Sequence, residues 1–147
     1  MSRILVSGSR DWKDLPTIQK AFDHYKPTVV IEGDASGADK IAGEEAGRRG
    51  IELEVFPAAW EVHDMDWCKC NGSEDHTYCA MAGPKRNQEM LELGVPDLVL
   101  AFHPFISKSR GTRDMVQRAR KMGVPVIIIA KPLSTAEIGQ MKLEEAM

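Results

Sequence analysis

The chain has no apolar run that approaches the ~18 residues a membrane-spanning helix requires. Its N-terminus leads directly into a short apolar stretch, Ile4–Val6, which is too short for the hydrophobic region of a secretory signal. These two absences predict a cytoplasmic protein with no membrane partner.

The sequence also has little excess charge and few aromatic residues. Its 19 Lys and Arg oppose 22 Asp and Glu, so the net charge is −3, and aromatics make up 6%. A broadly basic surface for nucleic acid is therefore excluded. A local basic run remains between Lys108 and Lys121, with six basic residues against one acid. It predicts either a solvated helix face or a strip that contacts single-stranded nucleic acid.

What is present is a regular alternation of apolar runs and helical patterns over 147 residues, a length that suits one domain, residues 1–147. Most of the apolar runs are continuous, as in parallel strands that are buried on both faces. The pattern predicts an α/β, Rossmann-like three-layer sandwich with a mostly parallel five-stranded sheet. The expected strands are Arg3–Ser7, Thr28–Ile31, Glu52–Phe56, Asp97–Phe102 and Val124–Ala130. Five helices are expected. The first begins after Asp14, the next three span Ala38–Arg49, Pro84–Gly94 and Thr112–Met122, and the last begins after Ser134.

Polar, glycine-containing segments follow three of these strands, at residues 8–12, 33–39 and 108–114. Ligands bind at the carboxyl ends of the strands in such folds, and all three segments would lie on that edge. None contains the Gly-Lys-Ser/Thr of a Walker A loop, and none reads GxGxxG. Each segment alone would be read as a plain turn between a strand and a helix. Three such segments on one edge predict a ligand site.

The residues of these segments suit a ligand that carries a phosphate. Gly8 permits close approach of the backbone, and Ser9 and Arg10 can donate to phosphate oxygens. Gly33 and Gly37 bracket a turn into a helix N-terminus, which favours an anion.

The same segments hold further candidates. Asp39 can accept from sugar hydroxyls or cap its helix. Arg110, Gly111 and Thr112 open the next helix among basic neighbours. Trp12 can stack on a base or plug the edge of the sheet.

Residues 58–82 have no helix or strand rhythm and form an insertion. They contain all three cysteines, with His76 between the second and the third. One reading is a structural zinc site in which Cys68, Cys70, His76 and Cys79 are the tetrahedral ligands. The other readings are three reduced thiols, or a disulfide with one thiol left over. Trp60, at the start of the insertion, could wall the ligand pocket.

Five motifs occur in an order that resembles the YspA-like branch of the SLOG superfamily, over about residues 3 to 130. They are GSRDW, GDASGAD, FPAAW, AGPKRNQEM and GTRDM. That superfamily includes the DNA-processing protein DprA and the LOG phosphoribohydrolases. The resemblance implies a Rossmann-like fold, often dimeric, that binds a nucleotide or a nucleotide derivative.

The resemblance also implies roles for single residues. Arg86 matches the arginine that LOG-type enzymes place beside the glycosidic bond, and the adjacent Asn87 could bind ligand or cap its helix. Asp114 stands where those enzymes carry a catalytic Glu, which is one methylene longer. The Gly-Gly turn of the family is replaced here by residues 103–110, in which Lys108 and Arg110 could supply side-chain contacts.

Three functions remain open on the sequence. The first is a sensor or carrier that binds a nucleotide-derived ligand, often as a homodimer. The second is an enzyme that hydrolyses the N-glycosidic bond of a nucleoside monophosphate or a related nucleotide, with Arg86 and Asp114 as its catalytic pair. The third is binding of single-stranded nucleic acid through the basic run.

Overall fold

The computed structural model describes residues 2–58 and 81–141. Five strands form one parallel sheet in the order β3-β2-β1-β4-β5. The strands are β1 (Arg3–Gly8), β2 (Val29–Glu32), β3 (Glu52–Val55), β4 (Leu98–Phe102) and β5 (Val126–Ile129). The helices are α1 (Leu15–Tyr25), α2 (Ala38–Arg49), α3 (Ala82–Gly94), α4 (Gly111–Lys121) and α5 (Thr135–Gln140), with a short 3-10 helix, η1 (Ile106–Lys108), before α4.

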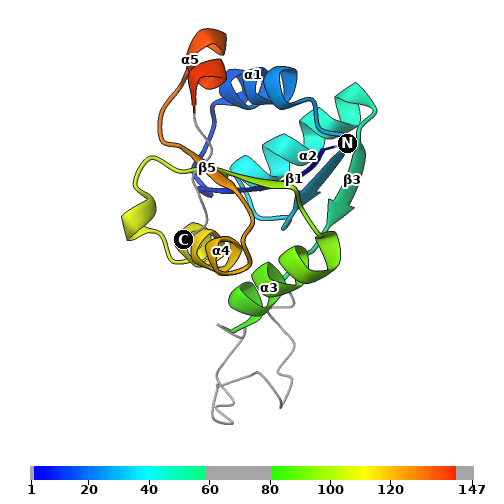
Figure 1. Ribbon diagram of the computed structural model, residues 1–147, viewed down its shortest axis with the longest axis vertical. Helices are drawn as coiled ribbons and strands as arrows, with labels where there is room; N and C mark the ends of the chain where they lie inside the picture. The colour runs from blue at the N-terminus through cyan, green and yellow to red at the C-terminus, as the bar shows by residue number, and fades with distance from the viewer. Residues whose placement is uncertain (1, 59–80, 142–147) are drawn as a thin grey trace.

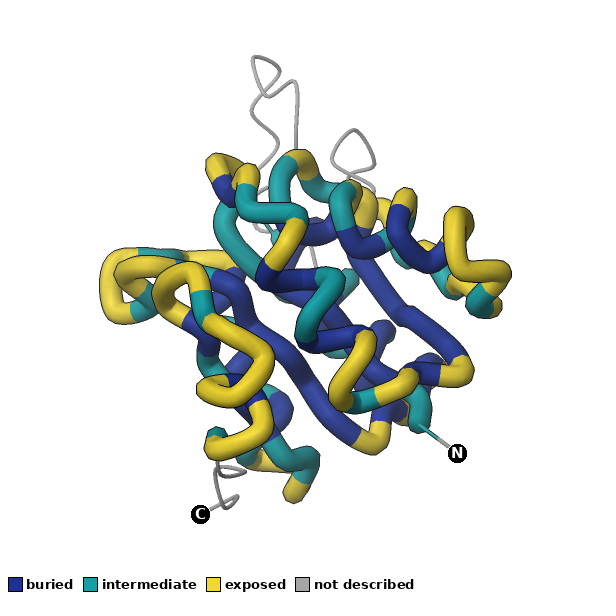
Figure 2. The backbone as a smooth tube through the Cα atoms, turned by 90° about the horizontal axis from the view of Figure 1, so that it is seen from above, coloured by how far each residue is buried: buried dark blue, intermediate teal, exposed yellow. Residues whose placement is uncertain are grey.

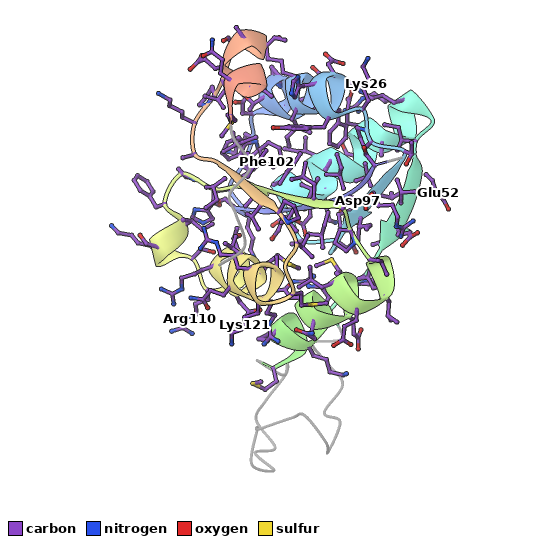
Figure 3. All side chains as sticks on the ribbon, in the orientation of Figure 1. Lys26, Glu52, Asp97, Phe102, Arg110 and Lys121 are labelled. Atoms are coloured by element: carbon purple, nitrogen blue, oxygen red, sulfur yellow. The ribbon has the colours of Figure 1, made fainter. Side chains whose placement is uncertain are left out.

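The helices cover both faces of the sheet, so the predicted three-layer α/β fold is confirmed. Helices α1, α2 and α5 lie on one face, and α3 and α4 lie on the other (Figure 1). The central strands are buried on both sides, whereas β3, at the edge, is largely exposed (Figure 2). Phe102, labelled in Figure 3, belongs to the core under α1 and α2.

Helix boundaries follow the sequence signals closely. Asp14 caps α1 by accepting from the N–H of Thr17 at 3.2 Å. Ser134 and Glu137 form the expected capping box of α5. None of the described helices is long and apolar enough to cross a membrane.

The end of α3 agrees with the prediction that the helix stops at Gly94, and the structure shows why a glycine stands there. Gly94 is the last helical residue, and a Cβ there would meet the side chain of Ile31 within 3.4 Å. Its glycine therefore serves the packing of α3 against β2. The left-handed position that ends the helix is taken by Val95, at φ +46°. A β-branched residue is strained in that region.

Replacing this valine tests the strain. Because Val95 is 63% exposed, Val95→Gly loses little buried surface and is expected to raise the free energy of unfolding by about 1 kcal/mol. The matched control is Val55→Gly in β3, which is 42% exposed at an extended position and is expected to lower it by about 0.5–1 kcal/mol. Urea denaturation measures both. Equal destabilisation by the two variants would contradict the interpretation of Val95.

Candidate functional site

The three predicted segments lie together at the carboxyl ends of β1, β2 and β4. They border a cavity of about 530 Å³ that also reaches the first turns of α3 and α4. From the first and third segments the cavity wall includes Gly8, Ser9, Arg10, Arg110, Gly111 and Thr112. From α2, α3 and α4 it includes Asp39, Arg86, Asn87 and Asp114.

The first segment is fastened to the sheet and to α2. The N–H of Ser9 donates to the carbonyl of Phe102 at 2.8 Å, which continues the pairing of β1 with β4. The carbonyl of Ser9 accepts from the N–H of Ala38 at 3.1 Å. A Cβ on Gly8 would collide with the Phe102 carbonyl and with Ala38. The glycine thus permits close packing of protein against protein at this corner of the site.

The second segment is held by the carboxylate of Asp39, which is 5% exposed. Its Oδ2 accepts from the N–H of Gly33 at 3.1 Å and of Ala35 at 3.4 Å. Gly37, at φ +79°, lies against the backbone of Ser9 and does not line the cavity. Asp39 therefore fixes the shape of the turn while it also borders the cavity.

Arg86 connects this turn to α3. Its Nη1 donates to the carbonyl of Gly33 at 2.5 Å, and its Nε donates to Oδ1 of Asn87 at 3.1 Å. A Cβ on Gly33 would overlap the guanidinium, so this glycine makes room for Arg86. Burial lowers the pKa of Arg86, and the nearby carboxylates of Asp39 and Glu32 oppose that shift.

Asn87 joins the two candidate catalytic residues. Its Nδ2 donates to Oδ2 of Asp114 at 3.0 Å and to the carbonyl of Gly111 at 3.2 Å, while its Oδ1 accepts from Arg86. Asp114 also accepts from Nε of Arg118 at 2.8 Å. At 3% exposure, Asn87 is a buried amide whose two ends are both satisfied. Arg86 and Asp114 both line the cavity, and Asn87 connects them.

The basic run is distributed differently from a continuous cationic strip. Arg118 turns towards Asp114 and Gln88, and Arg113 donates to the carbonyl of Ser107 at 2.9 Å. Lys108 lies over the ring of Phe105, 5.6 Å from its centroid. Ser109 Oγ accepts from the N–H of Thr112 at 3.0 Å, so one donor at the start of α4 is already used.

A second cavity of about 280 Å³ adjoins the first. The two cavities share Arg10, Ala35 and Arg86, and the second extends past Gly33 to Pro57. Arg10 and Arg86 therefore lie where the two cavities meet.

Three further predictions concern Trp12, Trp60 and the zinc site. Trp12 is 7% exposed and packs on Phe102 with ring centroids 5.5 Å apart, so it lies in the core and does not line the cavity. Trp60 and the expected zinc ligands, Cys68, Cys70, His76 and Cys79, lie outside the described residues. Within residues 2–58 and 81–141, no group of three His, Cys, Asp or Glu side chains is placed to hold a metal.

Two residues at or next to the site were missed by sequence reasoning. Glu32 ends β2, is 2% exposed and directly precedes the second segment, although it lines neither cavity. His103 directly follows β4 and lines the main cavity. A polar residue at the carboxyl end of a buried strand is the signal that could have found both.

Glu32 and Asp39 are two buried carboxyl groups, one at the end of β2 and one in the first turn of α2, and Asp39 borders the cavity. Burial and the nearby charges of Asp39 and Asp34 raise the pKa of Glu32 to about 8. Burial raises the pKa of Asp39 to about 6, although Arg86 and two backbone N–H groups act against the rise. Glu32 is therefore largely protonated at neutral pH in the folded protein.

This protonation makes a prediction for Glu32→Gln. With a folded pKa of about 8 against an ordinary 4.5, Glu32 contributes stability that is complete at low pH and is lost as pH rises through 8. The variant should gain stability relative to the wild type between about pH 5 and pH 8, by at most roughly 1.4 kcal/mol per pH unit. Chemical denaturation across that range measures the difference. Glu52→Gln, at an exposed position of the sheet, controls for the lost charge. A wild-type-minus-variant difference that does not change with pH would contradict the assignment.

Comparison with known proteins places this chain in a family. The family model for the YspA, cpYpsA-related SLOG family matches residues 2–63. Gene 61 protein of Mycobacterium phage D29 is 39% identical over 132 residues, which cover 86% of this chain and 95% of that protein. The X-ray structure of DNA processing protein A (DprA) from Streptococcus pneumoniae aligns with a TM-score of 0.62 at 17% identity. That alignment covers 87% of this chain, which spans half the length of the DprA chain, and it shows the shared fold. The chain belongs to the YspA and cpYpsA-related SLOG family.

Proposed function

We propose that the protein binds a small nucleotide-derived ligand, with its phosphate in the main cavity, as a sensor or carrier. The observation that carries this proposal is the convergence of three loops and two helix starts on one cavity of about 530 Å³. That volume lies within the range of small-molecule sites, about 300–1,000 Å³.

The distribution of charge around the cavity supports an anionic ligand. Arg10, Arg86 and Arg110 border it. Two carboxylates that also border the cavity already accept hydrogen bonds from the protein. Asp39 accepts from backbone N–H groups, and Asp114 accepts from Asn87 and Arg118. A phosphate group can take charge-assisted hydrogen bonds from the arginines.

The adjoining cavity supports a ligand with a second part. It is reached past Arg10 and Arg86, which border both spaces. A phosphate in the main cavity would leave this second space for the ribose or the base of the same molecule. A nucleotide fits this division better than free phosphate does.

Arg10→Ala tests the anionic part of the proposal. Thermal shift and calorimetry would compare nucleoside 5′-monophosphates, NAD, ADP-ribose and cyclic nucleotides. At ~100 times its dissociation constant, a true ligand adds about 2.7 kcal/mol of stability. The variant is expected to weaken binding of the best ligand roughly 10- to 100-fold, the value of a hydrogen bond to a charged group. Lys13→Ala, at an exposed position of the same loop, should bind like the wild type. No shift with any compound would contradict the proposal.

A second candidate is hydrolysis of the N-glycosidic bond of such a nucleotide, and the Arg86–Asn87–Asp114 connection favours it. In that reaction water adds to C1 of the ribose and the base leaves with a proton. The carboxylate of Asp114 would stabilise the oxocarbenium-like transition state or accept a proton from water. Asn87 would keep this carboxylate at the cavity wall.

Asp114→Asn separates the binding module from the hydrolase. The hydrolase predicts that the variant binds nucleotide within a few-fold of the wild type and releases no free base, as followed by chromatography. Asp23→Asn, on the exposed side of α1, should keep full turnover. An active Asp114→Asn protein would contradict the hydrolase, and a wild type that binds without turnover leaves the sensor or carrier.

A further inference from the structure

His103 directly follows β4 and lines the main cavity. The backbone still follows the sheet there, because the N–H of His103 donates to the carbonyl of Ile129 at 3.0 Å. Side chains alternate across a strand, and Phe102 packs towards α1 and α2. His103 therefore faces the side of α3 and α4, and it borders the cavity together with the start of α4.

A hydrogen bond within its own loop determines which nitrogen of the His103 ring is the acceptor. Nδ1 of His103 accepts from the N–H of Phe105 at 2.9 Å. A nitrogen that accepts carries no proton, so in the neutral imidazole the proton is on Nε2. Burial lowers the pKa of His103, with Asp11 acting in the opposite direction, and the neutral form prevails at neutral pH. The ring is thus a donor through Nε2, with its tautomer set before any ligand arrives.

Other donors border the same cavity as His103. They are Ser9, Arg10 and Arg110, and Gly111 begins α4 there, while Asp11 adds one carboxylate to the cavity wall. A group that suits these donors has several acceptor atoms. The oxygens of a phosphate ester have that character. Residues 103–110 contain no glycine, so side chains form this part of the wall.

We propose that His103 is a ligand-binding residue whose Nε2–H donates to a phosphoryl oxygen of the bound nucleotide. This inference rests on the proposed function and specifies which part of the ligand lies against the β4–α4 loop. It places the phosphate near the start of α4 and the nucleoside towards the adjoining cavity.

Two substitutions separate the two nitrogens of the ring. In His103→Asn the side-chain oxygen can still accept from Phe105, but nothing donates from the position of Nε2. In His103→Gln the longer amide can place a donor near that position. Binding would be measured by calorimetry for the 5′-monophosphates of adenosine, guanosine, cytidine and uridine and for the matching nucleosides.

The Asn variant is expected to bind the preferred monophosphate about 10- to 100-fold more weakly, the range for hydrogen bonds to charged groups. It should bind the matching nucleoside like the wild type. The Gln variant should stay within a few-fold of the wild type for both compounds.

The other outcomes contradict either the role of His103 or the proposed function. A wild type that binds a monophosphate, with an Asn variant that binds it equally, overturns the role of His103 alone. Equal losses for monophosphate and nucleoside also overturn that role, because they indicate a general change of the loop. If the Asn variant does not fold, a folded Gln variant that has lost its preference for the monophosphate overturns it. A wild type that binds none of these compounds overturns this inference. A wild type that also binds none of NAD, ADP-ribose and the cyclic nucleotides overturns the proposed function as well.

Discussion

The positive charge of the Arg86 guanidinium holds together two parts of the site, the turn after β2 and the start of α3. Removing such a group from water is costly unless hydrogen-bond acceptors and opposite charges surround it. Here the carbonyl of Gly33 and the amide of Asn87 accept from it, and the nearby carboxylate of Asp39 supplies negative charge. The turn after β2 and the start of α3 are therefore positioned by one side chain. Asn87 extends the connection to Asp114, and so to α4.

The glycines of the site also allow its segments to pack closely against one another. Gly8 brings β1 against β4, Gly33 admits Arg86, and Gly37 lets the turn before α2 meet Ser9. In each case an added Cβ would strike a neighbouring part of the protein. The cavity results from loops that are packed against one another, with hydrogen bonds such as that from Ala38 to Ser9 closing the contacts. Such a rigid wall suits a ligand of defined shape.

Much of this arrangement was predictable because it depends on local patterns. The apolar runs gave five strands close to their observed bounds, and parallel pairing then brought residues as distant as Ser9 and Gly111 to one edge. Other features depend on contacts between distant segments. The sequence alone does not distinguish a tryptophan that stacks on a base from one that lies in the core. The contact of Trp12 with Phe102 assigns Trp12 to the core. Nothing in the sequence around Gly94 indicates that Ile31 lies against it, or that Val95 ends the helix.

The central claim is that a nucleotide lies at the carboxyl ends of β1, β2 and β4, and a crystal structure with a bound nucleoside monophosphate tests it most directly. The account predicts density for the phosphate in the main cavity, within hydrogen-bond distance of Ser9 or Arg10 and beside the start of α4. It predicts the nucleoside on the side of Gly33 and Arg86. A nucleotide bound at any other surface, or an empty cavity at saturating ligand, would contradict the account.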